Sequence, residues 1–111
     1  MKILRFYTSN TDKIKHTSAY EAIAFAAKCY GLAGATVYKG IMGYGASSEL
    51  SSVKFWELNE KIPVIVEIVD EDDKISRFLE KIVPVLEKMP KGCLITCQST
   101  EVVLLKTGTS R

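Results

Sequence analysis

The pattern of apolar and polar positions predicts several strands along the chain. In the first, Lys2 to Thr8, Leu4 and Phe6 lie on one face and Ile3, Arg5 and Tyr7 on the other. The nearly unbroken apolar run from Ile62 to Asp70 predicts a strand that is covered on both faces. Further strand-like runs are Ala35 to Ile41, Cys93 to Gln98 and Glu101 to Lys106.

Two helices are predicted between these strands. Ser18 and Glu21 have the spacing of a capping box, so a helix is expected to begin there and to end at Gly31. Apolar residues from Ile75 to Met89 recur at helical spacing, and Pro84 is expected to kink or divide this second helix. The four acids of Asp70–Asp73 precede it, and we expect them to be solvated groups that favour its amino-terminal end.

The order of the elements predicts an α+β fold. We expect a ferredoxin-like βαββαβ sandwich over residues 1–108, with an antiparallel sheet, two helices on one face and an extra short C-terminal strand. Residues 109–111 are expected to be a flexible tail. In this arrangement the first and third long strands are central neighbours, which places Arg5 near Glu67 on the more polar face, alongside Tyr38.

The second face of the predicted sheet needs a cover. Two helices cover only one face, yet Ile3, Ile65, Val69 and Leu94 point to the other and are apolar. A closed homo-oligomer is the simplest cover, and Arg5 and Glu67 would then pair inside its interface. The alternative is a surface salt bridge on an open sheet.

Composition limits the class of protein. The chain has 111 residues, and its net charge of +2 comes from 15 basic and 13 acidic groups. This balance gives no strong electrostatic attraction to nucleic acid or to a membrane surface. The N-terminus lacks the apolar run of a signal peptide, and no segment is long and apolar enough to span a membrane. We therefore expect a cytoplasmic protein.

The sequence offers no metal site and no catalytic triad. Cys93 and Cys97 share a strand face but lie about 13 Å apart, too far for one metal ion. His16 has no cysteine or histidine at ligand spacing, and Cys29 stands among apolar neighbours. A nucleophile, a base and an orienting group cannot be assembled from these residues, so we expect no enzyme.

The stretch from Ala35 to Gly45 is the strongest candidate for ligand binding. It runs as a strand into Gly40, Gly43 and Gly45, with Lys39 just before the first of them. Such glycines mark a place where the chain bends or where something lies against it. Bare amides beside a mobile positive charge suit an anion, although a plain strand leading into a loop is the alternative.

These residues also carry a resemblance. The run Val37–Gly45 (VYKGIMGYG) and the strand Pro63–Asp70 (PVIVEIVD), with the order of elements, resemble the small family of uncharacterised PII-like proteins from Met1 to about Gly108. The resemblance implies a ferredoxin-like subunit that forms a homotrimer. It further implies an adenine nucleotide, AMP or ADP, bound in clefts between subunits.

The resemblance also implies which residues bind the ligand. They are the base of the loop after the second strand, the loop before the fourth strand and a basic C-terminal segment: Lys39, Gly40, Gly43, Tyr44, Gly45, Lys91, Gly92 and Lys106. The three lysines and the amides of the glycines would neutralise phosphate, and Tyr38, Tyr44 or an apolar strand end would pack against the purine. The loop before the fourth strand is reduced to Met89–Cys93 and the segment 46–54 is short, which disfavours triphosphate and the usual PII targets.

The leading hypothesis is a regulatory protein that binds this nucleotide and changes a partner surface in residues 44–54. A membrane transporter is the candidate partner, because some relatives are encoded with transport or fluoride-export proteins. A metal-tolerance-type trimer and a small ferredoxin-like enzyme are the alternatives. Ligand, partner and signal are not specified by the sequence.

Overall fold

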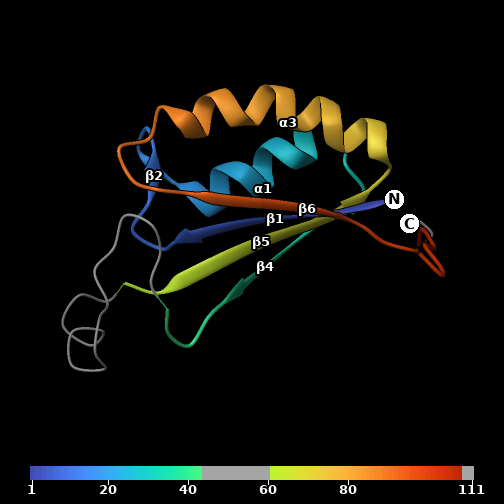
Figure 1. The fold of residues 1–111 in the computed structure, drawn as a ribbon, viewed down its shortest axis with the longest axis horizontal. Helices are drawn as coiled ribbons and strands as arrows, with labels where there is room; N and C mark the ends of the chain where they lie inside the picture. The colour runs from blue at the N-terminus through green and yellow to red at the C-terminus, as the bar shows by residue number, and fades with distance from the viewer. Residues whose placement is uncertain (44–60, 109–111) are drawn as a thin grey trace.

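The expected βαββαβ order is present in the computed structural model, which describes residues 1–43 and 61–108 (Figure 1). The principal elements are β1 (Lys2–Ser9), α1 (Ala19–Cys29), β4 (Ala35–Lys39), β5 (Pro63–Asp70), α3 (Asp72–Glu87) and β6 (Leu94–Ser99). The link between β1 and α1 contains two further short strands, β2 (Lys13–Ile14) and β3 (Thr17–Ser18), which pair with each other. Segment 46–54 and the tail 109–111, which are part of the predictions from sequence, lie outside the described residues.

The main sheet has the order β4-β5-β1-β6, and every pairing in it is antiparallel. Both helices lie on the same face of this sheet (Figure 1). The first and third long strands, β1 and β5, are therefore central neighbours, as the sequence predicted. The α+β fold, with its antiparallel sheet and two helices on one face, is confirmed.

The core lies between the sheet and the helices. Because successive strand residues point to opposite faces, Leu4 and Phe6 of β1 stand beside Ile68 and Val66 of β5, and all four are fully buried. The helices contribute the buried side chains Ile23, Ala27, Ile75, Phe78, Ile82 and Leu86. Phe78 occupies the centre, in edge-to-face contact with the rings of Phe6 and Tyr30.

The helix boundaries were predicted more accurately than the groups that cap them. Helix α1 begins after Ser18 as expected, but the Ser18 side chain makes no capping hydrogen bond within the described part of the chain, so the predicted capping box is wrong. Instead, the amide of Ala19 donates to the carbonyl oxygen of Asp12 at 2.8 Å. Gly31 ends the helix with a φ of 79°, the left-handed conformation that glycine adopts without strain.

Pro84 does not divide the second helix, which is continuous over Asp72–Glu87. Pro84 is exposed, while Ile82 and Leu86 on either side of it are buried in the core. Tertiary packing of these neighbours holds the helical path across the missing backbone donor.

The prediction of a solvated acidic run is wrong for Asp70. Its carboxylate is 4% exposed and accepts hydrogen bonds from the amides of Ala33 at 2.8 Å and Glu71 at 2.7 Å. Asp72 and Asp73 are exposed as expected. Asp70 therefore ties the segment after α1 to the end of β5 through these two hydrogen bonds.

The extra C-terminal strand is also absent, since no strand follows Ser99 within residues 61–108. The amide of Thr100 still donates to the carbonyl oxygen of Met1, and the chain then leaves the sheet. Val103, Leu104 and Leu105 are 97%, 77% and 62% exposed. A strand-like sequence becomes a strand only when it pairs with another strand, and residues 101–106 pair with none of the described strands.

Candidate functional site

The predicted glycine segment packs against the start of β5. The amide of Gly40 donates to the carbonyl oxygen of Pro63 at 2.8 Å, and a Cβ at position 40 would lie 3.2 Å from the Pro63 ring. At Gly43 the corresponding distance is 3.5 Å. Glycine at position 40 thus permits close approach to a rigid ring, which was one of the two roles that the sequence suggested.

This contact limits how Gly40 could bind an anion. Its amide is already engaged by Pro63 and is not a free donor for phosphate. Lys39, the residue before it, is exposed at the end of β4 and keeps its ammonium group in solvent. The charge of Lys39 is therefore the available part of this pair. Tyr44 and Gly45, the two remaining predicted residues of the segment, lie outside the described residues.

A polar turn, Ser9–Asp12, meets the start of β5 from the other side. The amide of Asn10 donates to the carbonyl oxygen of Ile62 at 3.0 Å, and the amide of Ile62 donates to Asn10 Oδ1 at 2.7 Å. Within the turn, the amide of Ser9 donates to Asp12 Oδ2 at 3.1 Å. The sequence pattern predicted no role for this turn. Its asparagine and aspartate, which often bond to nearby backbone, were the available signal.

Lys91 and Gly92 lie in the connection from α3 to β6, at the same end of the sheet as this turn (Figure 1). Lys91 is exposed and Gly92 is half-buried. They precede β6, which forms one edge of the sheet, whereas Lys39 ends β4, which forms the other edge. Within one chain, β5 and β1 therefore separate these two predicted parts of the site.

Lys106 is at the opposite end of the sheet. It follows β6, whose last residue, Ser99, pairs with Lys2 at the start of β1. The figure shows the C-terminal segment at this far end, away from the Lys39 and Lys91 segments (Figure 1). The structure brings two of the three predicted segments to one end of the sheet, and it does not bring the third to them.

Cys93 adjoins the polar turn. Burial raises the pKa of the Cys93 thiol, and the negative charge of Asp12 raises it further. Cys29 and Cys97 are exposed, and all three cysteines are free.

We expect iodoacetamide to modify Cys93 more slowly than Cys29 or Cys97 at pH 8. A raised pKa leaves less reactive thiolate at any given pH, and partial burial restricts access to the sulfur. The rate at Cys93 should therefore rise only at higher pH than for an ordinary thiol. Peptide mass spectrometry over time measures the three rates, and their difference should vanish in urea. Equal rates in the folded protein would contradict this placement.

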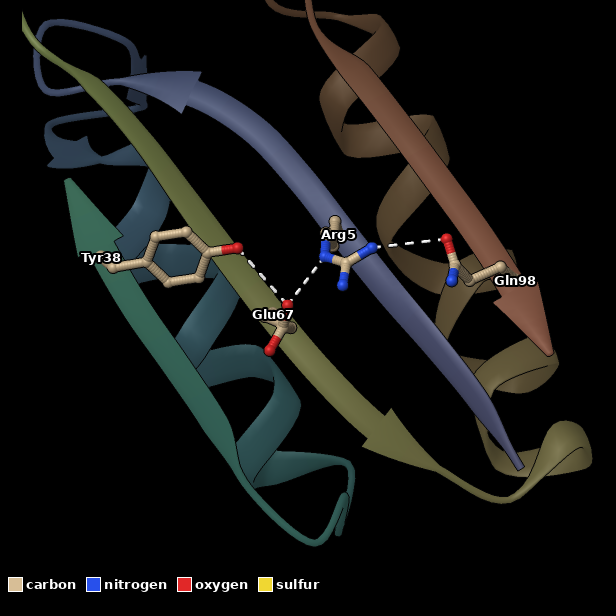
Figure 2. Close-up of polar contacts among 4 residues, drawn as sticks. All are labelled: Arg5, Tyr38, Glu67 and Gln98. Carbon is tan, nitrogen blue, oxygen red and sulfur yellow. Dashed lines mark hydrogen bonds and ion pairs between the residues drawn. The ribbon is translucent and has the colours of Figure 1, made fainter. Parts of the chain in front are cut away.

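The sheet face opposite the helices carries a polar network (Figure 2). Arg5 Nε donates to Glu67 Oε2 at 2.7 Å, so the predicted pairing of these residues is confirmed. Tyr38 Oη donates to the same oxygen at 3.4 Å, and Arg5 Nη1 donates to Gln98 Oε1 at 3.4 Å. The hydrogen bond to Glu67 raises the pKa of Arg5, with smaller contributions from the charge of Glu67 and from Tyr38. The network thus links all four strands.

Apolar side chains flank this network on the same face. The register aligns Tyr38, Ile65, Tyr7 and Leu94 in one row across the sheet, and Ile3 with Val69 in another. Tyr7, Tyr38 and Leu94 are 39%, 42% and 56% exposed. We call this surface, comprising the network and the two rows, the open face. The open face thus contains a charge pair, Arg5 and Glu67, that is neutralised within the chain, and apolar side chains that remain exposed to solvent.

Two other kinds of site receive no support from the described residues. Across residues 1–43 and 61–108, no three His, Cys, Asp or Glu side chains gather as a metal site would require. The helices in the same ranges are too short or too polar to cross a lipid bilayer.

Comparison with known proteins supports the resemblance. The chain matches the family described as DUF190 (Uncharacterized ACR, COG1993) over residues 1–102. It is 40% identical over 104 residues to a UPF0166 protein of Aquifex aeolicus (strain VF5), covering 94% of both chains. It is 38% identical over 86 residues to the UPF0166 protein MJ1524 of Methanocaldococcus jannaschii, covering 78% of this chain and 79% of the relative.

Solved structures give the fold. The chain is similar to CPII of Thiomonas intermedia K12 in its complex with ADP, AMP and acetate, with a TM-score of 0.56 and 13% identity over 91% of this chain and 88% of that one. A second structure of CPII, a nitrogen regulatory PII-like protein bound to ADP, AMP and bicarbonate, matches with the same TM-score. At this identity the likeness establishes a PII-like fold, as the sequence resemblance implied.

Proposed function

Because the chain belongs to the DUF190 (COG1993) family, we propose that it is a PII-like regulatory protein that binds an adenine nucleotide, AMP or ADP, between the subunits of a homotrimer. The observation that carries the proposal is the docking of the Lys39–Gly40 segment on Pro63, at the end of the sheet that also bears Lys91 and Gly92. The PII-like CPII structures, which hold ADP and AMP, supply the class of ligand.

The placement of the lysines favours a site shared between chains. Lys39 and Lys91 are at opposite edges of one end of the sheet, and Lys106 is at the other end. One phosphate group cannot contact all three within a single chain. A neighbouring subunit that presents a different edge would complete the set, so that ammonium groups from two chains neutralise the ligand.

The open face gives the subunits a reason to associate. Removing its apolar rows from water stabilises an oligomer by about 25 cal/mol for each Å² of apolar surface that is buried. The Arg5–Glu67 pair is already satisfied within one chain, so burying it leaves no unpaired charge. A second copy of the same chain is a suitable cover, because the open face of each copy carries apolar rows and a charge pair that is already neutralised within its own chain.

In this proposal the protein has no catalytic role and works in the cytoplasm. Ligand binding at Lys39 and Gly43 would alter the segment that begins with Tyr44 and Gly45, through which the protein contacts a partner. Such a response requires the ligand to bind one state of that segment more tightly than another. A membrane transporter is the candidate partner.

A thermal-shift titration tests the ligand. At about 100 times its dissociation constant, AMP or ADP should stabilise the protein by roughly 2.7 kcal/mol. Lys39→Ala should reduce the shift without lowering the melting temperature of the unliganded protein, because Lys39 is exposed. Lys74→Ala, an exposed lysine on α3, is the matched control and should keep the full shift. If neither AMP nor ADP changes the melting temperature of the wild-type protein, the nucleotide proposal fails.

A further inference from the structure

Asn10 extends the pairing of β1 with β5 by an unusual bond. The regular register ends with Ser9 opposite Pro63. One residue further, the amide of Asn10 bonds to the carbonyl oxygen of Ile62, but the amide of Ile62 bonds to the Asn10 side chain at 2.7 Å. In an ordinary antiparallel pair that second acceptor is a backbone carbonyl. The side chain of Asn10 therefore replaces the backbone as acceptor, which leaves the chain free to turn.

The turn that carries Asn10 is fixed to the core. Asp12 is 5% exposed, and its carboxylate accepts the amide of Ser9 at 3.1 Å. The carbonyl oxygen of Asp12 accepts the amide of Ala19, the first residue of α1. The position of Asn10 is thus set by two elements that pack in the core, β1 and α1.

The residue after Ile62 sets the position of the glycine segment. Pro63 accepts the amide of Gly40 at 2.8 Å, and its ring would lie 3.2 Å from a Cβ at position 40. On its other side, Thr8 Oγ1 donates to the carbonyl oxygen of Val64 at 3.0 Å. A continuous set of contacts therefore runs from Asn10 through Ile62 and Pro63 to Gly40, and Lys39 is the next residue.

We propose that Asn10 is a positioning residue for the ligand site, and that it acts on Lys39 and Gly40 through Ile62 and Pro63. The identity of the ligand in this inference depends on the proposed function, whereas the contacts from Asn10 to Gly40 do not. An acceptor at position 10 is required, because the amide of Ile62 would otherwise lose its partner. Aspartate can supply that acceptor and alanine cannot.

The first test needs no ligand. Native-state hydrogen exchange is followed at the amides of Ile62, Gly40 and Phe6 in the wild type, Asn10→Ala, Asn10→Asp and Thr11→Ala. In Asn10→Ala, exchange should accelerate at both Ile62 and Gly40 by up to about tenfold, the range of one lost hydrogen bond. Phe6, in the centre of β1, should change little. Asn10→Asp should stay near the wild type, as should Thr11→Ala, whose side chain bonds to Ser9 in the same turn.

Two outcomes would overturn the inference. Acceleration at Ile62 with no change at Gly40 would mean that Asn10 does not position the glycine segment. Equal acceleration at all three amides would mean a general loss of stability. The second test is the affinity for AMP and ADP, which should fall several-fold in Asn10→Ala and recover in Asn10→Asp. If the wild type binds neither nucleotide, the proposed function fails, and the exchange data still decide the role of Asn10.

Discussion

An Ile65→Asp variant is expected to sediment as a folded monomer at micromolar concentration, where the wild-type protein is expected to sediment as the proposed trimer. Ile65 is half-buried on the open face, in register with Tyr38 on one side and Tyr7 on the other. An unpaired carboxylate buried there costs several kcal/mol in each subunit. This cost is expected to exceed the free energy of association that the interface supplies, so the subunits should dissociate at these concentrations.

The control is Ser76→Asp on the exposed surface of α3, which should remain a trimer. Analytical ultracentrifugation gives the mass, and circular dichroism shows whether each variant is folded. A monomeric wild type would remove the interface from the proposal. A trimeric Ile65→Asp variant would place the interface on another surface.

Phe78→Ala is expected to lower the free energy of unfolding of the subunit by about 3–5 kcal/mol. The Phe78 ring is 1% exposed and makes edge-to-face contacts with Phe6 at 6.2 Å and Tyr30 at 5.8 Å between ring centroids. Its removal leaves a cavity at the centre of the core. Since small domains are stable by about 5–15 kcal/mol, the loss is a large part of the total.

Phe25→Ala is the matched control, because it deletes the same side chain at a site that is 69% exposed on α1. Its free energy of unfolding should stay within about 0.5 kcal/mol of the wild type. Urea denaturation in the Ile65→Asp background measures both values without a contribution from assembly. Similar effects of the two substitutions would contradict the assigned core.

Elements with a strong periodic pattern were predictable from the sequence. Alternation in β1 and the apolar run of β5 identified the two central strands, and their pairing placed Arg5 beside Glu67 at 2.7 Å. Gly31 ended α1 as expected, because its left-handed conformation depends on the residue itself. These features follow from local chemistry and from burial on one face.

Features that depend on tertiary partners were not predictable. The carboxylate of Asp70 accepts a hydrogen bond from the amide of Ala33, which lies 37 positions away in the sequence. The run 101–106 has a strand-like composition, but it pairs with no strand in the described chain. Pro84 is tolerated because buried neighbours hold the helix. Each outcome was decided by a contact that the local pattern does not contain.

The candidate site was predictable only in part. Lys39, Gly40 and Gly43 could be selected because glycines beside a lysine are uncommon in a strand, and the structure gives Gly40 a steric reason. The sequence did not indicate that the amide of Gly40 is occupied by Pro63, nor that Asn10 holds Ile62. Both contacts form because β5 pairs with β1 and β4, and the spacing of residues along the sequence does not predict these contacts.

A mixed-subunit experiment tests the central claim, that one ligand site takes residues from two chains. Lys39→Ala and Lys106→Ala subunits carrying different tags are co-expressed, and the mixed oligomers are isolated on both tags. Each variant alone should bind AMP or ADP weakly in calorimetry, whereas the mixed oligomer should regain part of the wild-type binding, because some interfaces then contain both lysines. Binding that stays as weak in the mixed oligomer as in either variant, with a wild type that binds, would place the whole site within one chain and contradict the claim.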